Sequence, residues 1–321
     1  MSQTEAMHPK LGRVIDNIDK VIIGKRDISI LSLVALLANG HVLLEDVPGV
    51  GKTMMVRALA KSVGAEFKRI QFTPDLLPSD VTGVAIYNPK ELRFEFQEGP
   101  IFGNIILADE INRTSPKTQS ALLEGMEEGS ITVDGTTRIL AKPFFVMATQ
   151  NPVDYEGTYP LPEAQLDRFL FKLRMGYPTK AEEFEVLTLA EKERPIYQLD
   201  SVITKEELAE LQNEIQHVYV DETIKHFIIE LTGKTRKHPS IYLGASPRAS
   251  IALMKAAQAY AFLYGRDYVI PDDIQYLAQY ALPHRIILRS EARFEGNSVE
   301  KIIHEIISQT TVPVQRTLSH K

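Results

Sequence analysis

The chain has 321 residues, which is long enough for two domains that each bury a core of their own. Hydrophobic residues make up 44% of it, yet no run of about 18 apolar residues predicts a membrane span. The absence of cysteine excludes disulfides, thiol catalysis and Cys-ligated metals. A formal net charge of −6 gives no bulk attraction to nucleic acid or anionic lipid. Because the N-terminus lacks a basic-then-apolar signal pattern, we expect a cytoplasmic protein.

Strands and helices alternate in the first half of the chain, which predicts an α/β fold. The pattern indicates strands at 41–44, 67–72, 105–108, 144–149 and 170–173, of which 41–44 and 105–108 read as buried. It indicates helices at 28–39, 54–63 and about 116–128. Two alternating segments, 83–98 and 130–140, read as β-hairpins. Each carries a turn signal, Asn88-Pro89 in the first and Asp134-Gly135 in the second.

After about residue 178 the chain has helical patterns only. Thr204 with Glu207 predicts a capping box, and Asp221 caps the next helix. Ser246-Pro247 then begins a long helix in the preferred N-cap and N1 order. We therefore predict an α/β core domain at 1–178, a connector at 179–203 and a small all-helical lid domain at 204–321.

Residues 45–53, EDVPGVGKT, stand between a predicted strand and a predicted helix. This is the setting of a phosphate-binding loop, in which backbone N–H groups surround the phosphates at a helix N-terminus. Lys52 would reach the outer phosphates, and the Thr53 hydroxyl would bind Mg²⁺. One position departs from the consensus G-x-x-x-x-G-K-[ST], because Asp46 replaces the first glycine. The alternative is an ordinary glycine turn before a helix.

Polar residues follow two other predicted strands. Asp109 and Glu110 come directly after 105–108, at the strand end where ligands of open α/β sheets bind. Beside a phosphate loop, Asp109 would hold Mg²⁺ and Glu110 would orient and deprotonate the attacking water. Asn151 follows 144–149, where an amide could hydrogen-bond this water or the γ-phosphate. Alternatively, residues 149–152 are simply a turn.

Two arginines are candidates for transition-state stabilisation. In a ring, Arg168 could reach the γ-phosphate bound by a neighbouring copy. Its alternative is a surface ion pair with Asp167 or Glu163. Arg248 lies in the first turn of a predicted helix, where a positive charge is unfavourable, so either a nearby anion or exposure to water would compensate.

The order of these motifs resembles that of AAA+ ATPases, and more narrowly of the MoxR family. The segments that carry the resemblance are LEDVPGVGKT (44–53), DEINR (109–113), ATQNP (148–152), LPEAQLDRF (161–169) and GASPR (244–248). The match extends over nearly the whole chain after residue 10. Asp46 in place of the first glycine is usual in this family, and the two hairpins match the insertions known from its clade. The resemblance implies an α/β AAA+ domain, with a parallel sheet between helices, followed by a helical lid.

The resemblance also implies roles for individual residues. Lys52 and Thr53 look like the Walker A pair, and Asp109 and Glu110 look like Walker B. Asn151 resembles sensor 1, Arg168 the arginine finger that acts in trans, and Arg248 sensor 2. The cofactors would be ATP and Mg²⁺, with Thr53 and Asp109 binding the ion. The adenine would lie near Ile22, Ile23 and Gly24. The phosphate loop and the start of the helix after it would bind the rest of ATP through Val47, Pro48, Gly49, Val50, Gly51, Lys52, Thr53 and Met54.

Members of this family are hexameric ATPases thought to remodel or mature protein complexes, often by assisting metal insertion, with a von Willebrand A domain partner. The resemblance therefore implies a ring of copies of this chain acting on a client protein complex, away from membranes. Alternatives are an MCM-like nucleic-acid motor and a magnesium-chelatase-type motor subunit. The near-neutral hairpins argue against strong nucleic-acid binding. A phosphate-loop kinase would leave the two arginines and the hairpins without a role.

Overall fold

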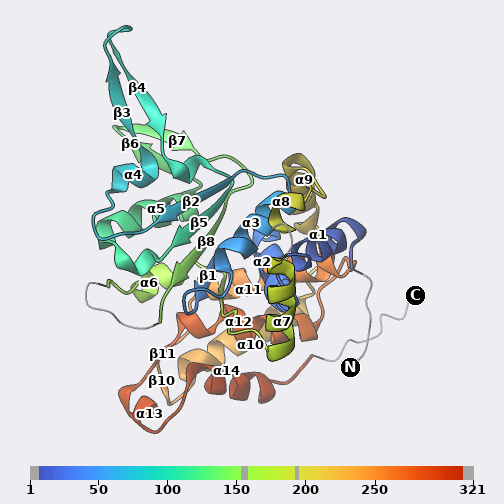
Figure 1. Ribbon diagram of the computed structural model, residues 1–321. Coiled ribbons are helices and arrows are strands. Elements are labelled where there is room, and N and C mark those ends of the chain that lie inside the picture. Colours follow the sequence, from blue (N-terminus) through green and yellow to red (C-terminus); the bar gives the residue numbers. More distant parts are fainter. Residues whose placement is uncertain (1–6, 153–157, 192–194, 314–321) are drawn as a thin grey trace. The chain divides into compact units, whose positions relative to one another are not determined.

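The computed structural model describes residues 7–152, 158–191 and 195–313 (Figure 1). These residues form two compact units. The first runs from Met7 to Asn213, and the second contains the chain from Glu214 onward. The domain boundaries at 178 and 203 stay predictions.

A five-stranded parallel sheet forms the centre of the first unit. Its strands follow the order β2-β5-β8-β1-β9, and all neighbouring pairs are parallel. They are β1 (Val42–Glu45), β2 (Phe67–Gln71), β5 (Ile105–Asp109), β8 (Phe145–Gln150) and β9 (Phe171–Leu173). The strand segments expected from the sequence thus correspond to every strand of this sheet, and the parallel α/β fold is confirmed.

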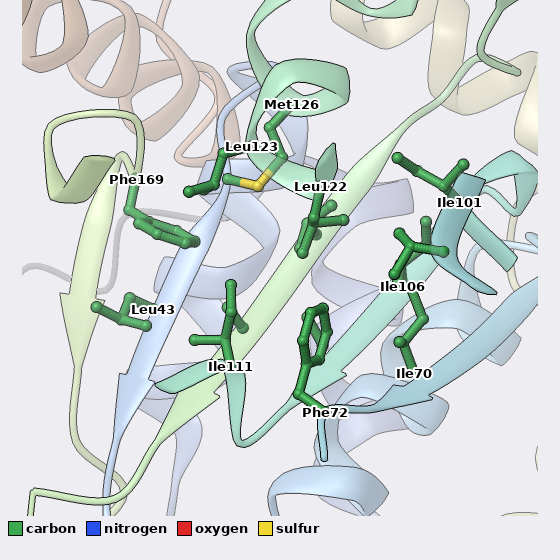
Figure 2. Packing of buried hydrophobic residues seen from close by; sticks show 14 of the residues in the cluster. Leu43, Ile70, Phe72, Ile101, Ile106, Ile111, Leu122, Leu123, Met126 and Phe169 are labelled. Carbon is green, nitrogen blue, oxygen red and sulfur yellow. The ribbon is translucent and has the colours of Figure 1, made fainter. Parts of the chain in front are cut away.

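Helices pack on both faces of the sheet, because successive side chains of a strand point to opposite faces. Ile106 and Ala108 of β5 belong to one core cluster with α5 (Pro116–Glu128), whose Leu122 and Met126 lie over the strands (Figure 2). Strand β5 also contacts helix α3 (Lys52–Ser62). The other helical segments of this unit are α1 (Pro9–Asp19), α2 (Arg26–Leu37), α4 (Pro78–Thr82), η1 (Pro100–Phe102), η2 (Ile111–Arg113), α6 (Glu163–Leu166), α7 (Lys180–Ala190), α8 (Pro195–Gln198) and α9 (Lys205–Ile215), which ends just past Asn213.

Both predicted hairpins are present. The first pairs β3 (Gly83–Asn88) with β4 (Arg93–Glu98), and the second pairs β6 (Ser130–Val133) with β7 (Thr136–Ile139). In the second, Asp134 and Gly135 both have positive φ, 51° and 73°. Left-handed backbone at both central residues is what a two-residue hairpin turn requires, so the Asp-Gly signal was sufficient to predict it.

The second unit is helical, as the sequence predicts. Its helices are α10 (Glu222–Lys237), α11 (Pro247–Leu263), α12 (Pro271–Ala281), η3 (Pro283–Arg285), α13 (Ser290–Phe294) and α14 (Val299–Ser308). It also contains a short antiparallel pair, β10 (Ile241–Leu243) with β11 (Ile287–Leu288), which the sequence analysis does not predict. Strands of three and two residues are too short to show a period. In the described part of the chain, no helix combines the length and apolar character needed to cross a bilayer.

A buried histidine joins the sheet to α5. His41 precedes β1 and is 5% exposed. Its Nδ1 accepts the N–H of Val146 at 3.1 Å, and its Nε2 lies 3.1 Å from the carbonyl oxygen of Met126. Both bonds form only with the neutral ring that carries its proton on Nε2. Burial lowers the pKa of His41 to about 4, although the bond to Met126 acts in the opposite direction.

We expect His41 to make the stability of the protein depend on pH. Because the pKa of His41 is about 4 in the folded protein, below its ordinary value of 6.5 in the unfolded chain, the unfolded chain binds more protons between these pH values. The contribution is complete above pH 6.5 and is lost as the pH falls toward 4. Between pH 7.5 and pH 5 the loss amounts to about 2 kcal/mol. Urea unfolding of His41→Gln at both pH values should show a correspondingly smaller change, whereas a control at exposed His226, His226→Gln, should keep the wild-type change.

Candidate functional site

Two adjoining pockets lie at the carboxyl end of the sheet in the first unit. We call them the polar pocket and the apolar pocket. The polar pocket is lined by Pro48, Gly49, Gly51, Lys52, Thr53, Met54, Arg69, Gln71, Asp109, Glu110 and Asn151. The apolar pocket is lined by Val21, Ile22, Ile23, Lys25, Gly49, Val50, Gly51, Met54, Met175, Pro178, Val186, Leu189 and Ala190. Gly49 and Gly51, in the glycine loop between β1 and α3, line both pockets together with Met54 of α3, so the pockets meet at this loop.

The loop between β1 and α3 has the backbone of an anion-binding site. Gly49 and Gly51 adopt φ values of 87° and 94°, a conformation that side chains disfavour. Gly51 is the N-cap of α3, which therefore begins at Lys52, two residues before the predicted start. The free N–H groups and the positive end of the helix dipole then face the polar pocket. This arrangement suits a polyphosphate.

Lys52 is held inside this loop. Its Nζ donates to the carbonyl oxygen of Asp46 at 2.8 Å. Burial lowers the pKa of Lys52, while the negative charges of Asp109, Asp46 and Glu110 oppose that change. The ammonium group is thus bonded to the loop and interacts electrostatically with the carboxylates of Asp109 and Glu110.

Asp109 and Glu110 are fixed from both neighbouring strands. The Asp109 carboxylate accepts the Thr149 hydroxyl of β8 at 2.7 Å and pairs with Arg69 of β2 at 2.6 Å. The Thr149 oxygen in turn accepts the N–H of Glu110 at 2.8 Å. Glu110 therefore has its backbone position set by a buried hydroxyl, and its φ of 57° is left-handed.

Arg69 and Gln71 are residues that sequence reasoning missed. They lie two residues apart on β2 and so point to the same face. Gln71 pairs in register with Asp109, and its Nε2 donates to the Glu110 carboxylate at 3.1 Å. Glu110 also pairs with Arg113 at 2.9 Å. The available signal was the set of polar residues in a predicted strand, Lys68, Arg69 and Gln71, but its meaning depends on β2 lying next to β5.

The apolar pocket contains two of the three residues predicted near the adenine, Ile22 and Ile23. The third, Gly24, is not among its lining residues. It has a φ of 71°, and a Cβ there would come within 2.0 Å of the Glu182 carboxylate of α7. Gly24 therefore permits close approach to α7 instead of forming the wall. Of the predicted loop residues, Val47 lines neither pocket. The sequence analysis missed the opposite wall, which Met175, Pro178, Val186, Leu189 and Ala190 supply.

Arg168 is not among the lining residues of either pocket, and Arg248 belongs to the second compact unit. Arg168 follows α6, and its Nε pairs with Glu127 of α5 at 2.8 Å. This ion pair is with a third acidic residue, different from the Asp167 and Glu163 considered above. Arg248 is exposed in the first turn of α11, in the second compact unit, where Ser246 caps the N–H of Ala249 at 3.4 Å. Its role at a bound nucleotide stays a prediction.

Two family models match the chain. "ATPase family associated with various cellular activities (AAA)" matches residues 41–171, and "AAA lid domain" matches residues 233–306. The first range contains the glycine loop, both strand-end carboxylates, Asn151 and Arg168. An AAA domain of this kind binds a nucleotide.

Similar proteins cover nearly the full length. The chain is 70% identical to the protein YeaC of Bacillus subtilis (strain 168), over 99% of each chain. It is 41% identical to the protein named "Chaperone MoxR1" of Mycobacterium tuberculosis, over 94% of this chain and 82% of that protein. A crystal structure of a Cytophaga hutchinsonii protein matches it with a TM-score of 0.90 and 45% identity, over 95% of this chain and 96% of that chain. With its glycine loop, strand-end carboxylates and helical second unit, the chain belongs to the MoxR family of AAA+ ATPases.

Proposed function

We propose that this protein binds ATP with Mg²⁺ in the two adjoining pockets and hydrolyses it to ADP and phosphate. One observation carries the proposal: Lys52 and Thr53, at the N-terminus of α3, line the same pocket as Asp109 and Glu110. A cationic, N–H-rich cradle facing two carboxylates suits a triphosphate and the water that attacks it. The neighbouring apolar pocket supplies a place for the base.

The oxygen atoms present fit Mg²⁺, which prefers hard oxygen ligands. Thr53 and Asp109 would hold the ion, and it would neutralise charge that develops on the phosphates. In the described residues no group of three or more His, Asp or Glu could hold a metal alone. The proposed site therefore takes its other ligands from phosphate and water. Arg69 would give up its bond to Asp109.

Glu110 is the proposed general base, because its carboxylate lies at the polar pocket and its bonds to Gln71 and Arg113 are exposed. Asn151 would hydrogen-bond the attacking water or the γ-phosphate, and it lines the same pocket. Its position at the end of β8 supports this role, since the alternative, a plain turn, requires no contact with the pocket.

We further propose that copies of this chain form a hexameric ring, in which Arg168 and Arg248 act on the phosphates. The ring would remodel or mature a client protein complex, for example by metal insertion, together with a von Willebrand A domain partner. The relative named as a chaperone supports a protein client. The hairpins support the same choice over nucleic acid. Arg93 pairs with Glu91 and Glu95, and the Arg138 Cζ lies 3.8 Å from the centroid of the Phe96 ring. These cations already interact within the chain, which argues against strong binding to nucleic-acid phosphates. We place the protein in the cytoplasm.

The replacement Glu110→Gln should leave ATP binding intact and slow hydrolysis by about 10²-fold or more, because only the base is removed. Lys52→Ala should lose ATP affinity. The measurements are ATP binding by calorimetry and phosphate release, with Arg13→Ala at an exposed position of α1 as the control. Normal turnover by Glu110→Gln would remove Glu110 from the base role. Glu110→Gln kept in ATP can also be used in a pull-down to capture the client protein, because it should stay in the ATP-bound state.

The replacement Arg168→Ala should slow hydrolysis strongly, on the order of 10³-fold, while ATP affinity stays nearly unchanged. Mixing Arg168→Ala with Glu110→Gln subunits should restore part of the phosphate release. In such a mixture some sites combine an intact Glu110 with an intact Arg168 from the adjoining copy. Absence of any recovery would contradict a site shared between chains.

The left-handed backbone of Glu110 should reverse the usual order of alanine and glycine. Both Glu110→Gly and Glu110→Ala lose the carboxylate, but only alanine keeps the strain of a positive φ. We expect the glycine variant to be more stable by about 1 kcal/mol in urea unfolding. At exposed Glu124 inside α5, the same two variants should show the opposite order, by a similar amount.

A further inference from the structure

Asp46 occupies the position where the general phosphate-loop motif has glycine, and its side chain is 7% exposed. Its Oδ1 accepts the N–H of Val47 at 2.9 Å, and its Oδ2 accepts the N–H of Gly176 at 2.6 Å. Its own carbonyl oxygen accepts the Lys52 ammonium at 2.8 Å. One residue therefore connects the beginning of the loop, the loop lysine and a segment 130 positions further along the chain.

The segment that Asp46 holds is one wall of the apolar pocket. Gly176 lies between Met175 and Pro178, which both line this pocket. Met175 is 5% exposed and lies against the loop: a Cβ on Gly51 would be 3.9 Å from its Cε. At the far end of the segment, Lys25 of the same pocket donates to the carbonyl oxygen of Tyr177 at 3.1 Å. The wall is thus tied at both ends, and Asp46 makes the tie nearer the phosphate loop.

A negative charge beside a phosphate loop is unfavourable for binding a polyanion, so the benefit of Asp46 must lie elsewhere. Its neighbour shows the same arrangement. Glu45 is also buried and pairs with Lys172 at 2.7 Å and Arg174 at 2.5 Å. Burial alone would raise the pKa of Glu45, but the bonds from these two cations lower it. The two acidic residues together fasten β9 and the segment after it to the start of the loop.

We infer that Asp46 is a positioning residue for recognition of the nucleoside: its carboxylate sets the distance between the phosphate loop and the Met175–Pro178 wall of the base pocket. This inference rests on the proposed ATP site. Asp46 is not among the residues that line the polar pocket, where the proposed phosphates would bind. Its removal should therefore weaken binding of the base and ribose while binding of a bare triphosphate is kept.

The test compares ATP with inorganic tripolyphosphate, which carries the phosphates without a base. Affinities of both are measured by calorimetry for the wild type, Asp46→Gly and Asp46→Asn at the same Mg²⁺ concentration. Asp46→Gly should lose about tenfold in ATP affinity, the equivalent of one charge-assisted hydrogen bond. Its tripolyphosphate affinity should stay the same or increase, because a nearby negative charge is removed. Asp46→Asn keeps one acceptor oxygen, so its ATP affinity should lie between those of the wild type and Asp46→Gly.

The ratio of the two affinities decides the outcome. If ATP and tripolyphosphate affinities change by the same factor in both variants, Asp46 is only a structural part of the loop and the inference is wrong. Asp75→Gly, which removes an exposed carboxylate outside both pockets, should leave the ratio at the wild-type value. Should Asp46→Gly fail to fold, the ratio for Asp46→Asn decides alone. A wild type that binds no ATP would instead overturn the proposed function.

Discussion

Strands β1, β5 and β8 run parallel in a register that pairs Leu44 with Thr149 and Ala108 with Ala148. Their carboxyl ends therefore reach the same edge of the sheet. The glycine loop follows β1, Asp109 ends β5 with Glu110 directly after it, and Asn151 follows β8. Since each strand is buried along nearly its whole length, a shift in register would move apolar side chains out of the core. The packing of the core thus fixes which polar residues meet.

Much of this arrangement can be predicted from the sequence, because the information is local. Four largely apolar runs and the mixed segment 67–72 predict the five strands. The loop residues and Asp109-Glu110 are contiguous with two of them. Cap residues such as Ser246 and Thr204 predict helix starts within a residue. The Asp134-Gly135 turn likewise specifies its hairpin without help from the rest of the chain.

The remaining parts of the site come from contacts between distant segments. Arg69 and Gln71 reach the carboxylates only because β2 lies beside β5, which no local pattern states. Met175 and Val186 have the spacing of ordinary core residues, yet they line the apolar pocket. Gly24 is a similar case. A side chain there would collide with Glu182 of α7, about 160 positions away, and this contact cannot be inferred from the position of Gly24 next to Ile22 and Ile23.

The ion pair between Arg168 and Glu127 has a consequence for assembly. Both side chains are partly exposed, at 27% and 29%, so the pair is accessible to water and to dissolved ions. An arginine that serves an adjoining copy must first exchange this bond within its own subunit for one to a neighbour's phosphate. In the proposed ring, this exchange would replace one ionic contact with another. The equilibrium would therefore depend on ionic strength and on whether the neighbouring copy has bound a nucleotide. In a lone subunit, Glu127 would thereby hold the Arg168 guanidinium in an ion pair. In the ring, Arg168 would exchange this partner for a triphosphate, which carries more negative charge than one carboxylate.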